Sequence, residues 1–271
     1  MAELLCPVCG AVLQKNEKSY VCPARHSFDL AKSGYVNLLL NSSQGHHGDD
    51  KLMVRARRDF LDKGYYDPLA REIAALCVQY APERSLIVDA GCGEGKYTAD
   101  VLAALQCSGK SAEIVGVDIS KDALAYAARR CRELTLAVAS VSRLPLAAES
   151  ADLVLNIFAP YVPEEFHRVL RPGGRLVRVY PLERHLWELK SLVYDRPYEN
   201  PPTPLQTDGF AIAETREVRY TVHLPCAEDI TALFRMTPYY YKTGRADQQK
   251  AERAENLDVS LCFGITVYEK R

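Results

Sequence analysis

The sequence predicts an α/β fold in which a Rossmann-like, mostly parallel sheet of seven strands follows a small N-terminal module. Three observations predict it. A glycine-rich loop at 91–95 joins a short apolar run to a helical pattern, as in the first turn of a nucleotide-binding unit. From residue 84 onward, strand-like runs alternate with helical segments, which is the order that a parallel sheet requires. Three cysteines and one histidine gather within residues 1–40.

The length and charge of the chain limit the kinds of protein it can be. Its 271 residues are enough for a complete α/β domain with an accessory module. A formal net charge of −1 excludes a strongly basic nucleic-acid binder, so any contact with RNA must use local basic patches. No apolar run approaches the roughly 20 residues of a membrane helix and no signal pattern is present, so no membrane association is expected. The scattered cysteines predict a cytoplasmic location.

The N-terminal module, residues 1–40, contains a metal-ligand pattern. Cys6, Cys9, Cys22 and His26 have the spacing Cys-x2-Cys-x12-Cys-x3-His. Two pairs of such ligands build a closed tetrahedral zinc site, and four protein ligands indicate a structural rather than a catalytic ion. Because the module has few apolar residues, metal binding would supply the free energy that folds it. The alternative is a reduced cysteine pair beside an unrelated histidine.

Residues 41–81 are expected to form a linker and two helices. The polar segment 41–50 predicts a linker, and whether 41–51 closes over a site as a lid stays open. Its His46 and His47 are expected to be solvated rather than bound to metal. The expected helices, from apolar residues at helical spacing, are 53–61 and 69–80, with a turn at 64–68.

Residues 82–271 are expected to form the sheet domain. Its parallel strands are expected at 86–89, 114–118, 135–139, 153–158 and 176–180. A helix is expected after each of the first four strands, including 97–105, 121–132 and 163–170. The other expected features are a tight turn at 171–174, a proline-rich substrate-side insertion at 193–209, an antiparallel edge of 218–224 and 259–268, and an N-terminal hairpin of 12–13 and 20–21.

The loop after the first of these strands has an informative glycine spacing. Asp89 ends the strand, and Gly91, Gly93 and Gly95 follow as Gly-x-Gly-x-Gly, not as the Gly-x-Gly-x-x-Gly of dinucleotide-binding folds. Glycine lets the backbone approach a nucleotide-like ligand closely. This spacing, with an acid just before it, resembles motif I of the S-adenosylmethionine-dependent methyltransferases. The resemblance implies that S-adenosylmethionine is the cofactor and that Glu94 lies in its binding loop.

The next strand ends in Asp118, at the separation from the loop where Rossmann-like folds place the acid that holds ribose hydroxyls. The alternative is a surface acid at the end of a buried strand, but a helix-capping serine follows in register. Ligands gather at the carboxyl ends of such strands, so residues there are expected near the cofactor. These residues are Ile119, then Ser140 beside the adenine, and Asn156 and Phe158 beside the methyl group.

Further motifs extend through most of the chain. They are Cys22-Pro23-x-x-His26-x-Phe28-Asp29, Lys32-x-Gly34-Tyr35-Val36-Asn37-Leu38-Leu39, Arg57-Arg58-x-Phe60-Leu61, Arg184-His185-Leu186 and Met236-Thr237-Pro238. Together with the glycine loop, they resemble the large-subunit (23S) ribosomal RNA guanine-N1 methyltransferases. The zinc module is the specific part of this resemblance, because the core motifs occur throughout the superfamily.

The resemblance implies methyl transfer to N1 of a guanine in a domain II hairpin of 23S rRNA, an RNA-recognition role for the zinc module, and a homodimer. It also implies that Tyr66, Gly95, Lys96 and His185 contact the cofactor. Asn156 and Phe158, which follow the fourth strand, differ from the residues expected there in the best-known members of this family. Two subfamilies modify neighbouring guanines, and the sequence assigns the chain to neither.

The chemistry of guanine N1 adds further expectations. N1 carries a proton and lies on the pairing edge, so the base must be unpaired or flipped, and a general base or water must accept the proton. No catalytic residue is predicted, although His185 could act as the base instead of binding the cofactor. The aromatic candidates for holding the guanine are Phe158, Tyr161 and 239–241, although the tyrosine run 239–241 is expected to be part core and part surface rather than a stacking platform. The candidates for phosphate contact, with a solvated helix face as the alternative, are Arg55, Arg57 and Arg58.

Two other functions stay open at this point. A small-molecule methyltransferase would need only the core of the chain. A zinc-dependent RNA-binding protein could keep a vestigial pocket that binds no cofactor.

Overall fold

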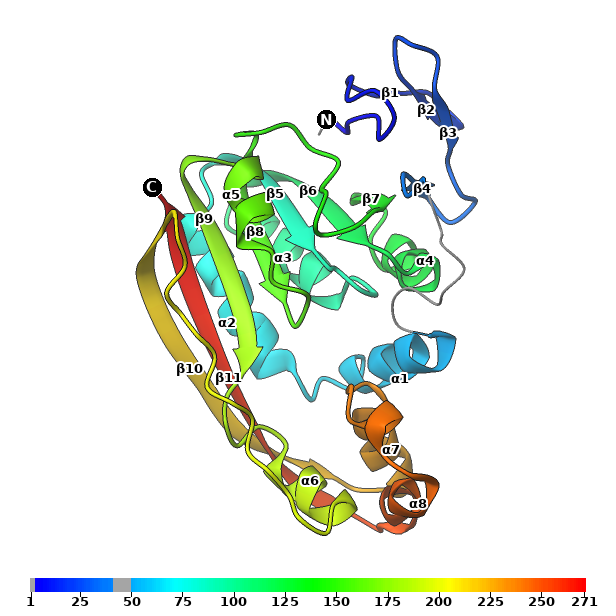
Figure 1. Ribbon diagram of the computed structural model, residues 1–271, viewed down its shortest axis with the longest axis vertical. Helices are drawn as coiled ribbons and strands as arrows, with labels where there is room; N and C mark the ends of the chain where they lie inside the picture. The colour runs from blue at the N-terminus through cyan, green and yellow to red at the C-terminus, as the bar shows by residue number, and fades with distance from the viewer. Residues whose placement is uncertain (1–2, 41–49) are drawn as a thin grey trace.

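The structure is a computed structural model that describes residues 3–40 and 50–271. The predicted linker, including His46 and His47, lies outside the described residues except for Asp50. Within the described residues, the central sheet has eight strands in the order β10-β11-β9-β8-β5-β6-β7-β4 (Figure 1). Their bounds are β4 Tyr35–Asn37, β5 Arg84–Ala90, β6 Ser111–Asp118, β7 Thr135–Val138, β8 Ala151–Ile157, β9 Leu170–Pro181, β10 Phe210–Leu224 and β11 Leu257–Lys270.

The prediction of a mostly parallel α/β sheet is confirmed. Strands β4 to β9 pair in parallel, and β10 and β11 form the expected antiparallel edge. The predicted number of seven strands is wrong for the described residues, because β4 adds to the sheet beside β7. This strand comes from the N-terminal module and has three residues, too few to produce an alternating pattern.

Helices cover both faces of the sheet. Their bounds are α1 Lys51–Leu61, α2 Asp67–Tyr80, α3 Lys96–Cys107, α4 Lys121–Arg130, α5 Pro163–Val169, α6 Trp187–Val193, α7 Ala227–Arg235 and α8 Arg245–Arg253, with a 3-10 turn, η1, at Tyr240–Lys242. Successive strand residues point to opposite faces, so Ile87 packs with α2, α3 and α4, whereas Val88 packs with α5 and the N-terminal module. None of the helices in the described part of the chain has the length and apolar character needed to cross a membrane.

The N-terminal module packs directly on the sheet. Its strands β1 Gln14–Lys15, β2 Ser19–Val21 and β3 Ser27–Asp29 form a small antiparallel sheet, so the predicted hairpin is present with its first strand two residues later. Leu4 and Tyr20 are buried in the same core cluster as Val88. The backbone N–H of Leu5 donates to the carbonyl of Pro145 at 2.9 Å. The module and the sheet therefore share one apolar core.

Two predictions about connections are wrong. Residues 139–150, all of them described, contain no helix; the segment forms turns and bends around Pro145, which has no backbone N–H to donate, and Leu144, Pro145 and Leu146 are buried in succession. The predicted turn at 171–174 lies inside β9. Pairing with β8 steps from Ala151–Leu170 to Leu153–Arg175, so this segment bulges within the strand.

Three short helices near the C-terminus were not predicted, and they form a group beyond the end to which the β9 arrow points (Figure 1). Helix α7 packs on α1, and α8 packs on α6 and α7. The buried carboxylate of Asp229 in α7 forms an ion pair with Lys63 and accepts a hydrogen bond from the Tyr65 hydroxyl at 2.6 Å. These contacts fix α7 against the turn between α1 and α2.

Candidate functional site

The glycine loop between β5 and α3 is held in a conformation that other residues rarely adopt. Gly91 and Gly95 have φ values of 94° and 82°. A Cβ atom on Gly91 would clash with Cβ of Ala159, and one on Gly95 would lie 2.8 Å from Cβ of Ala127. The backbone N–H of Gly91 donates to the carbonyl of Val117 at 2.8 Å, which ties the loop to β6. Glycine is therefore required here by both backbone conformation and space.

Asp89 is buried at the start of this loop. Its Oδ2 accepts a hydrogen bond from the Thr98 hydroxyl at 2.5 Å, whereas Oδ1 has no hydrogen-bond partner among the described residues. Burial raises the pKa of Asp89 to about 7; the Thr98 hydrogen bond opposes this shift, and the nearby charge of Asp118 adds to it. A buried acceptor oxygen without a donor is costly, so a ligand with an N–H or O–H group would stabilise it.

Asp118 lies beside the loop at the carboxyl end of β6. Its Oδ2 accepts from the Gly93 N–H at 3.0 Å, and its Oδ1 accepts from the Ser120 N–H at 2.8 Å. The chain after β7 returns to the same place, because the N–H of Ala139 donates to the carbonyl of Asp118 at 3.1 Å. Thus the structure brings the loop, Asp118 with the adjacent Ile119, and Ser140 together at one edge of the sheet, where ligands bind in such folds.

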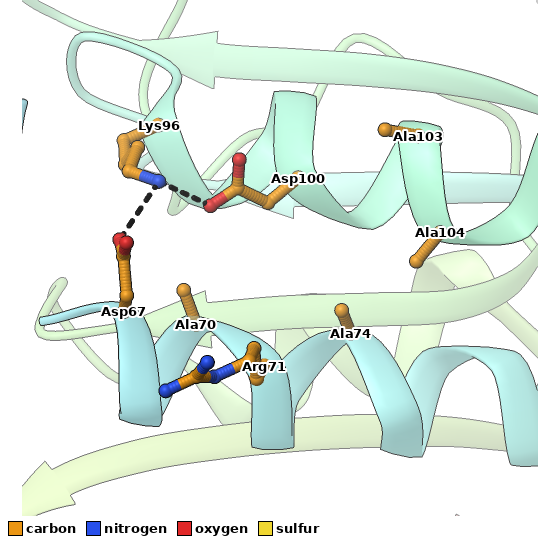
Figure 2. A pocket seen from close by; sticks show the side chains of 8 residues that line it. All are labelled: Asp67, Ala70, Arg71, Ala74, Lys96, Asp100, Ala103 and Ala104. Atoms are coloured by element: carbon orange, nitrogen blue, oxygen red, sulfur yellow. Dashed lines mark hydrogen bonds and ion pairs between the residues drawn. The ribbon is translucent and has the colours of Figure 1, made fainter. Parts of the chain in front are cut away.

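Two charged loop residues have protein partners outside the loop. The carboxylate of Glu94 is buried and pairs with Arg130 at 2.6 Å. The Lys96 ammonium points away from the loop and pairs with Asp67 of α2 at 3.2 Å and Asp100 of α3 at 2.7 Å (Figure 2). It lines an open cavity of about 310 Å³ between these helices. The structure thus does not bring this ammonium together with the other predicted cofactor residues.

Three predicted cofactor residues instead converge on Phe263 of β11. The ring centroids of Tyr66, Phe158 and His185 lie 5.1, 5.5 and 4.6 Å from that of Phe263. Sequence patterns did not predict Phe263, because it lies within a continuous apolar strand. The available signal was the adjacent Gly264, since a glycine inside a strand marks a close approach by another group.

Phe158 differs from the other three residues in its exposure and backbone. It follows the end of β8, has a φ of 53°, and is 44% exposed, whereas Phe263 is fully buried. A non-glycine residue held in the left-handed region costs conformational energy, and such residues cluster at functional sites. Nearby, the amide nitrogen of Asn156 donates to the carbonyl of Pro160 at 3.1 Å and so holds the chain that carries Phe158.

His185 is buried and neutral. Burial and, to a lesser extent, the charge of Lys190 lower the pKa of His185 to about 3. Its Nδ1 lies 3.2 Å from the backbone nitrogen of Cys262 and accepts a hydrogen bond from it, so the ring proton is assigned to Nε2. In this tautomer His185 offers a donor, and it is a poor candidate for the general base.

The other aromatic candidates are held by protein contacts. The Arg178 guanidinium lies 3.7 Å from the ring centroid of Tyr161. The Tyr239 hydroxyl donates to Oδ1 of Asn200 at 2.7 Å, and the exposed Tyr241 donates to Asp50 at 2.8 Å. These hydroxyls and rings anchor segments of the chain to one another.

The four predicted metal ligands form a compact cluster. The sulfur atoms of Cys6, Cys9 and Cys22 and a ring nitrogen of His26 all lie within 4.8 Å of one another. Nδ1 of His26 lies 3.3 Å from Sγ of Cys22 and 3.6 Å from Sγ of Cys6. Three thiols and one imidazole at these separations fit a tetrahedral zinc ion and leave no open position for a substrate.

Comparison with known families matches both parts of the chain. A family model described as "RlmA, N-terminal", a zinc ribbon, matches residues 4–41, and a model described as "Methyltransferase domain" matches residues 87–174. The first match contains the Cys/His cluster and β4, and the second begins within β5 and contains the glycine loop and Asp118.

Curated relatives match over more of the chain. A Bacillus subtilis (strain 168) protein provisionally named 23S rRNA (guanine-N(1)-)-methyltransferase is 32% identical over 270 residues, which cover 97% of this chain and 95% of the relative. A Micromonospora griseorubida protein with the same provisional name is 39% identical over 70% of this chain and 69% of its own length. The 23S rRNA (guanine(748)-N(1))-methyltransferase of Streptomyces fradiae is 40% identical over 69% of this chain and 66% of its own length.

Proposed function

The chain belongs to the family of 23S rRNA (guanine-N1)-methyltransferases, and we propose that it methylates N1 of a guanine in a domain II hairpin of 23S rRNA. It is an S-adenosylmethionine-dependent methyltransferase with a zinc ribbon. The observation that carries the proposed substrate is that the similarity to the Bacillus subtilis rRNA methyltransferase extends over 97% of the chain, so it includes both the Cys/His module and the sheet that bears the glycine loop.

The residues around the loop fit S-adenosylmethionine. Oδ1 of Asp89 is a buried acceptor that a donor group of the cofactor would satisfy. The carboxylate of Asp118 can accept from the two ribose hydroxyls, as acids at this position do in Rossmann-like folds. When bound, the cofactor supplies a methyl group that its sulfonium has already activated. The protein therefore acts mainly by placing the nucleophile in line with that group.

The acceptor side of the site follows from the position of Phe158. Its exposed ring at the end of β8 offers a surface on which an unpaired or flipped guanine can stack. Its ring packs on Phe263, on which Tyr66 and His185, the expected cofactor contacts, also pack. Guanine N1 must lose its proton during transfer. The neutral His185 is better suited to donate a hydrogen bond from Nε2 than to accept this proton.

Labelling of purified RNA tests the proposal. The protein with S-adenosylmethionine labelled in its methyl group is expected to label 23S rRNA from a strain that lacks the modification. Primer extension should then stop at one guanine of a domain II hairpin. RNA that stays unlabelled, or a stop outside domain II, would contradict the proposed substrate.

We also propose that the enzyme is a cytoplasmic homodimer. Sedimentation of the purified protein would test the dimer, and fractionation of cells would test the location.

A further inference from the structure

The three arginines of α1 lie in different surroundings. Arg55 is exposed, and its guanidinium lies 3.6 Å from a carboxylate oxygen of Asp59. Arg58 also pairs with Asp59, and its guanidinium lies 4.6 Å from the ring centroid of Tyr126. Arg57 is half-buried and points to a different side of the helix. One helix thus presents arginines to solvent, to a neighbouring helix, and toward the glycine loop.

The Arg57 guanidinium lies over the glycine loop. A Cβ atom placed on Gly93 would lie 3.8 Å from Nη1 of Arg57, and Nη2 donates to the carbonyl of Met236 at 3.4 Å. Burial raises the pKa of Tyr66 and of Tyr97 well above the usual range, and the positive charge of Arg57 opposes the shift in both. The guanidinium is therefore placed between α1, the loop and the end of α7.

Two other cations near the loop are Lys96 on α3 and Arg130 on α4. Lys96 is held by the two aspartates that Figure 2 shows. Arg130 pairs with the buried Glu94 and with Asp62, each within 2.7 Å. Arg130 reaches the loop at Glu94, where its Nε donates to the backbone carbonyl at 3.3 Å, whereas the Arg57 guanidinium lies against Gly93. An anionic group of a ligand lying on Gly93 would therefore contact Arg57.

The expected position of the cofactor decides which group this is. With its ribose at Asp118 and its methyl group toward Phe158, the methionine part must lie across the glycine loop. The carboxylate is the only anionic group of S-adenosylmethionine, and arginine binds carboxylates with two parallel hydrogen bonds. We propose that Arg57 binds the methionine carboxylate of the cofactor. This inference rests on the cofactor site described under the proposed function.

A cofactor analogue that lacks the carboxylate tests this role directly. Calorimetry would measure the affinity of the full chain for S-adenosylmethionine and for decarboxylated S-adenosylmethionine. Arg57→Gln is expected to lower the affinity for S-adenosylmethionine by about 10- to 100-fold, which is the usual range for the loss of a charged hydrogen bond. The second ligand has no group for Arg57 to bind, so its affinity should stay the same or rise slightly as a positive charge is removed. Arg57→Lys should give an intermediate loss.

The control and the opposing outcomes are equally specific. Arg55→Gln, on the same helix, should change neither affinity. An equal loss for both ligands in Arg57→Gln would overturn the proposal, because it would indicate a general disturbance of the site. Unchanged cofactor affinity with weaker RNA binding would also overturn it and would assign Arg57 to a phosphate. If the unaltered protein bound neither ligand, the cofactor site itself would be wrong.

Discussion

The metal cluster and the cofactor site are assembled in opposite ways. The metal ligands lie between Cys6 and His26, so a short stretch of chain brings them together. The proposed cofactor site combines residues from Tyr66 to Phe263, which different strands and helices position. A bound ion would stabilise the first region, whereas packing and glycine geometry stabilise the second. The two regions should therefore respond first to different perturbations, although they share a core.

Removal of zinc is expected to have the largest effect on stability. It should destabilise both regions, not the metal-binding region alone. Because Leu4 and Tyr20 share a core with Val88, loss of the metal should destabilise the sheet as well. We expect Cys22→Ser or chelation to lower the free energy of unfolding by about 4 kcal/mol or more, measured by denaturant titration. Cys107→Ser, at an exposed cysteine, is the control. Unfolding of the sheet at an unchanged denaturant concentration would show that the regions are independent.

Gly91→Ala is expected to have the next largest effect and to act on the packed region alone. The new methyl group would meet Ala159, and φ at this position is 94°. Gly109→Ala is a matched control, because Gly109 has a φ of 79° and no atom within 4 Å of an added Cβ. We expect about 3 kcal/mol of destabilisation for the first variant and about 1 kcal/mol for the second. Equal losses would mean that only the backbone conformation matters.

Asp89 should make the cofactor region sensitive to pH. Its pKa of about 7 in the folded protein lies above its ordinary value of 3.8, so between these values the folded state holds a proton that the unfolded chain has lost. This contribution to stability therefore falls as the pH rises toward 7 and is flat above it. Relative to Asp89→Asn, the unaltered protein should lose about 2 kcal/mol between pH 5 and pH 7. A constant difference across this range would contradict the burial argument.

Asp118→Asn is expected to have the smallest effect. It should weaken cofactor binding and leave the shared core and the metal cluster intact. Replacing the charged acceptor should lower the affinity for S-adenosylmethionine, measured by calorimetry, by about tenfold, or about 1.4 kcal/mol of binding free energy. Asp122→Asn, at a half-exposed acid on α4, should leave the affinity unchanged. Zinc content should be normal in both variants. A loss of zinc in Asp118→Asn would mean that the two regions are coupled more tightly than their contacts indicate.

The contrast between the regions also explains how much the sequence could predict. The metal ligands could be predicted because their spacing is local, and the loop and Asp118 because they belong to one strand–helix–strand unit. The packing of Tyr66, Phe158 and His185 on Phe263 could not be predicted, because it depends on the pairing of β11 with β9, which are far apart in the sequence. The direction of Lys96 also depends on an acid of α2, which no motif contains.

The missed elements have the same physical cause. Helices α6, α7 and α8 are seven to nine residues long and are stabilised by packing on α1, β11 and one another. The pairing of strand β4 with β7 joins segments that are far apart in the sequence. The prediction of a tight turn at 171–174 is wrong because the strand continues through its proline and glycines with a shift in register. The location of the 193–209 segment on the substrate side of the enzyme stays a prediction.

The pairing of β4 with β7 has a consequence for truncated forms of this protein. A shortened chain starting at residue 50 would leave β7 as a bare edge, with free N–H and C=O groups and an uncovered apolar face around Val115 and Ala137. Exposed edges of this kind recruit strands from other chains. Such a fragment should aggregate when expressed, so inactivity of the fragment would say nothing about which molecules the enzyme methylates.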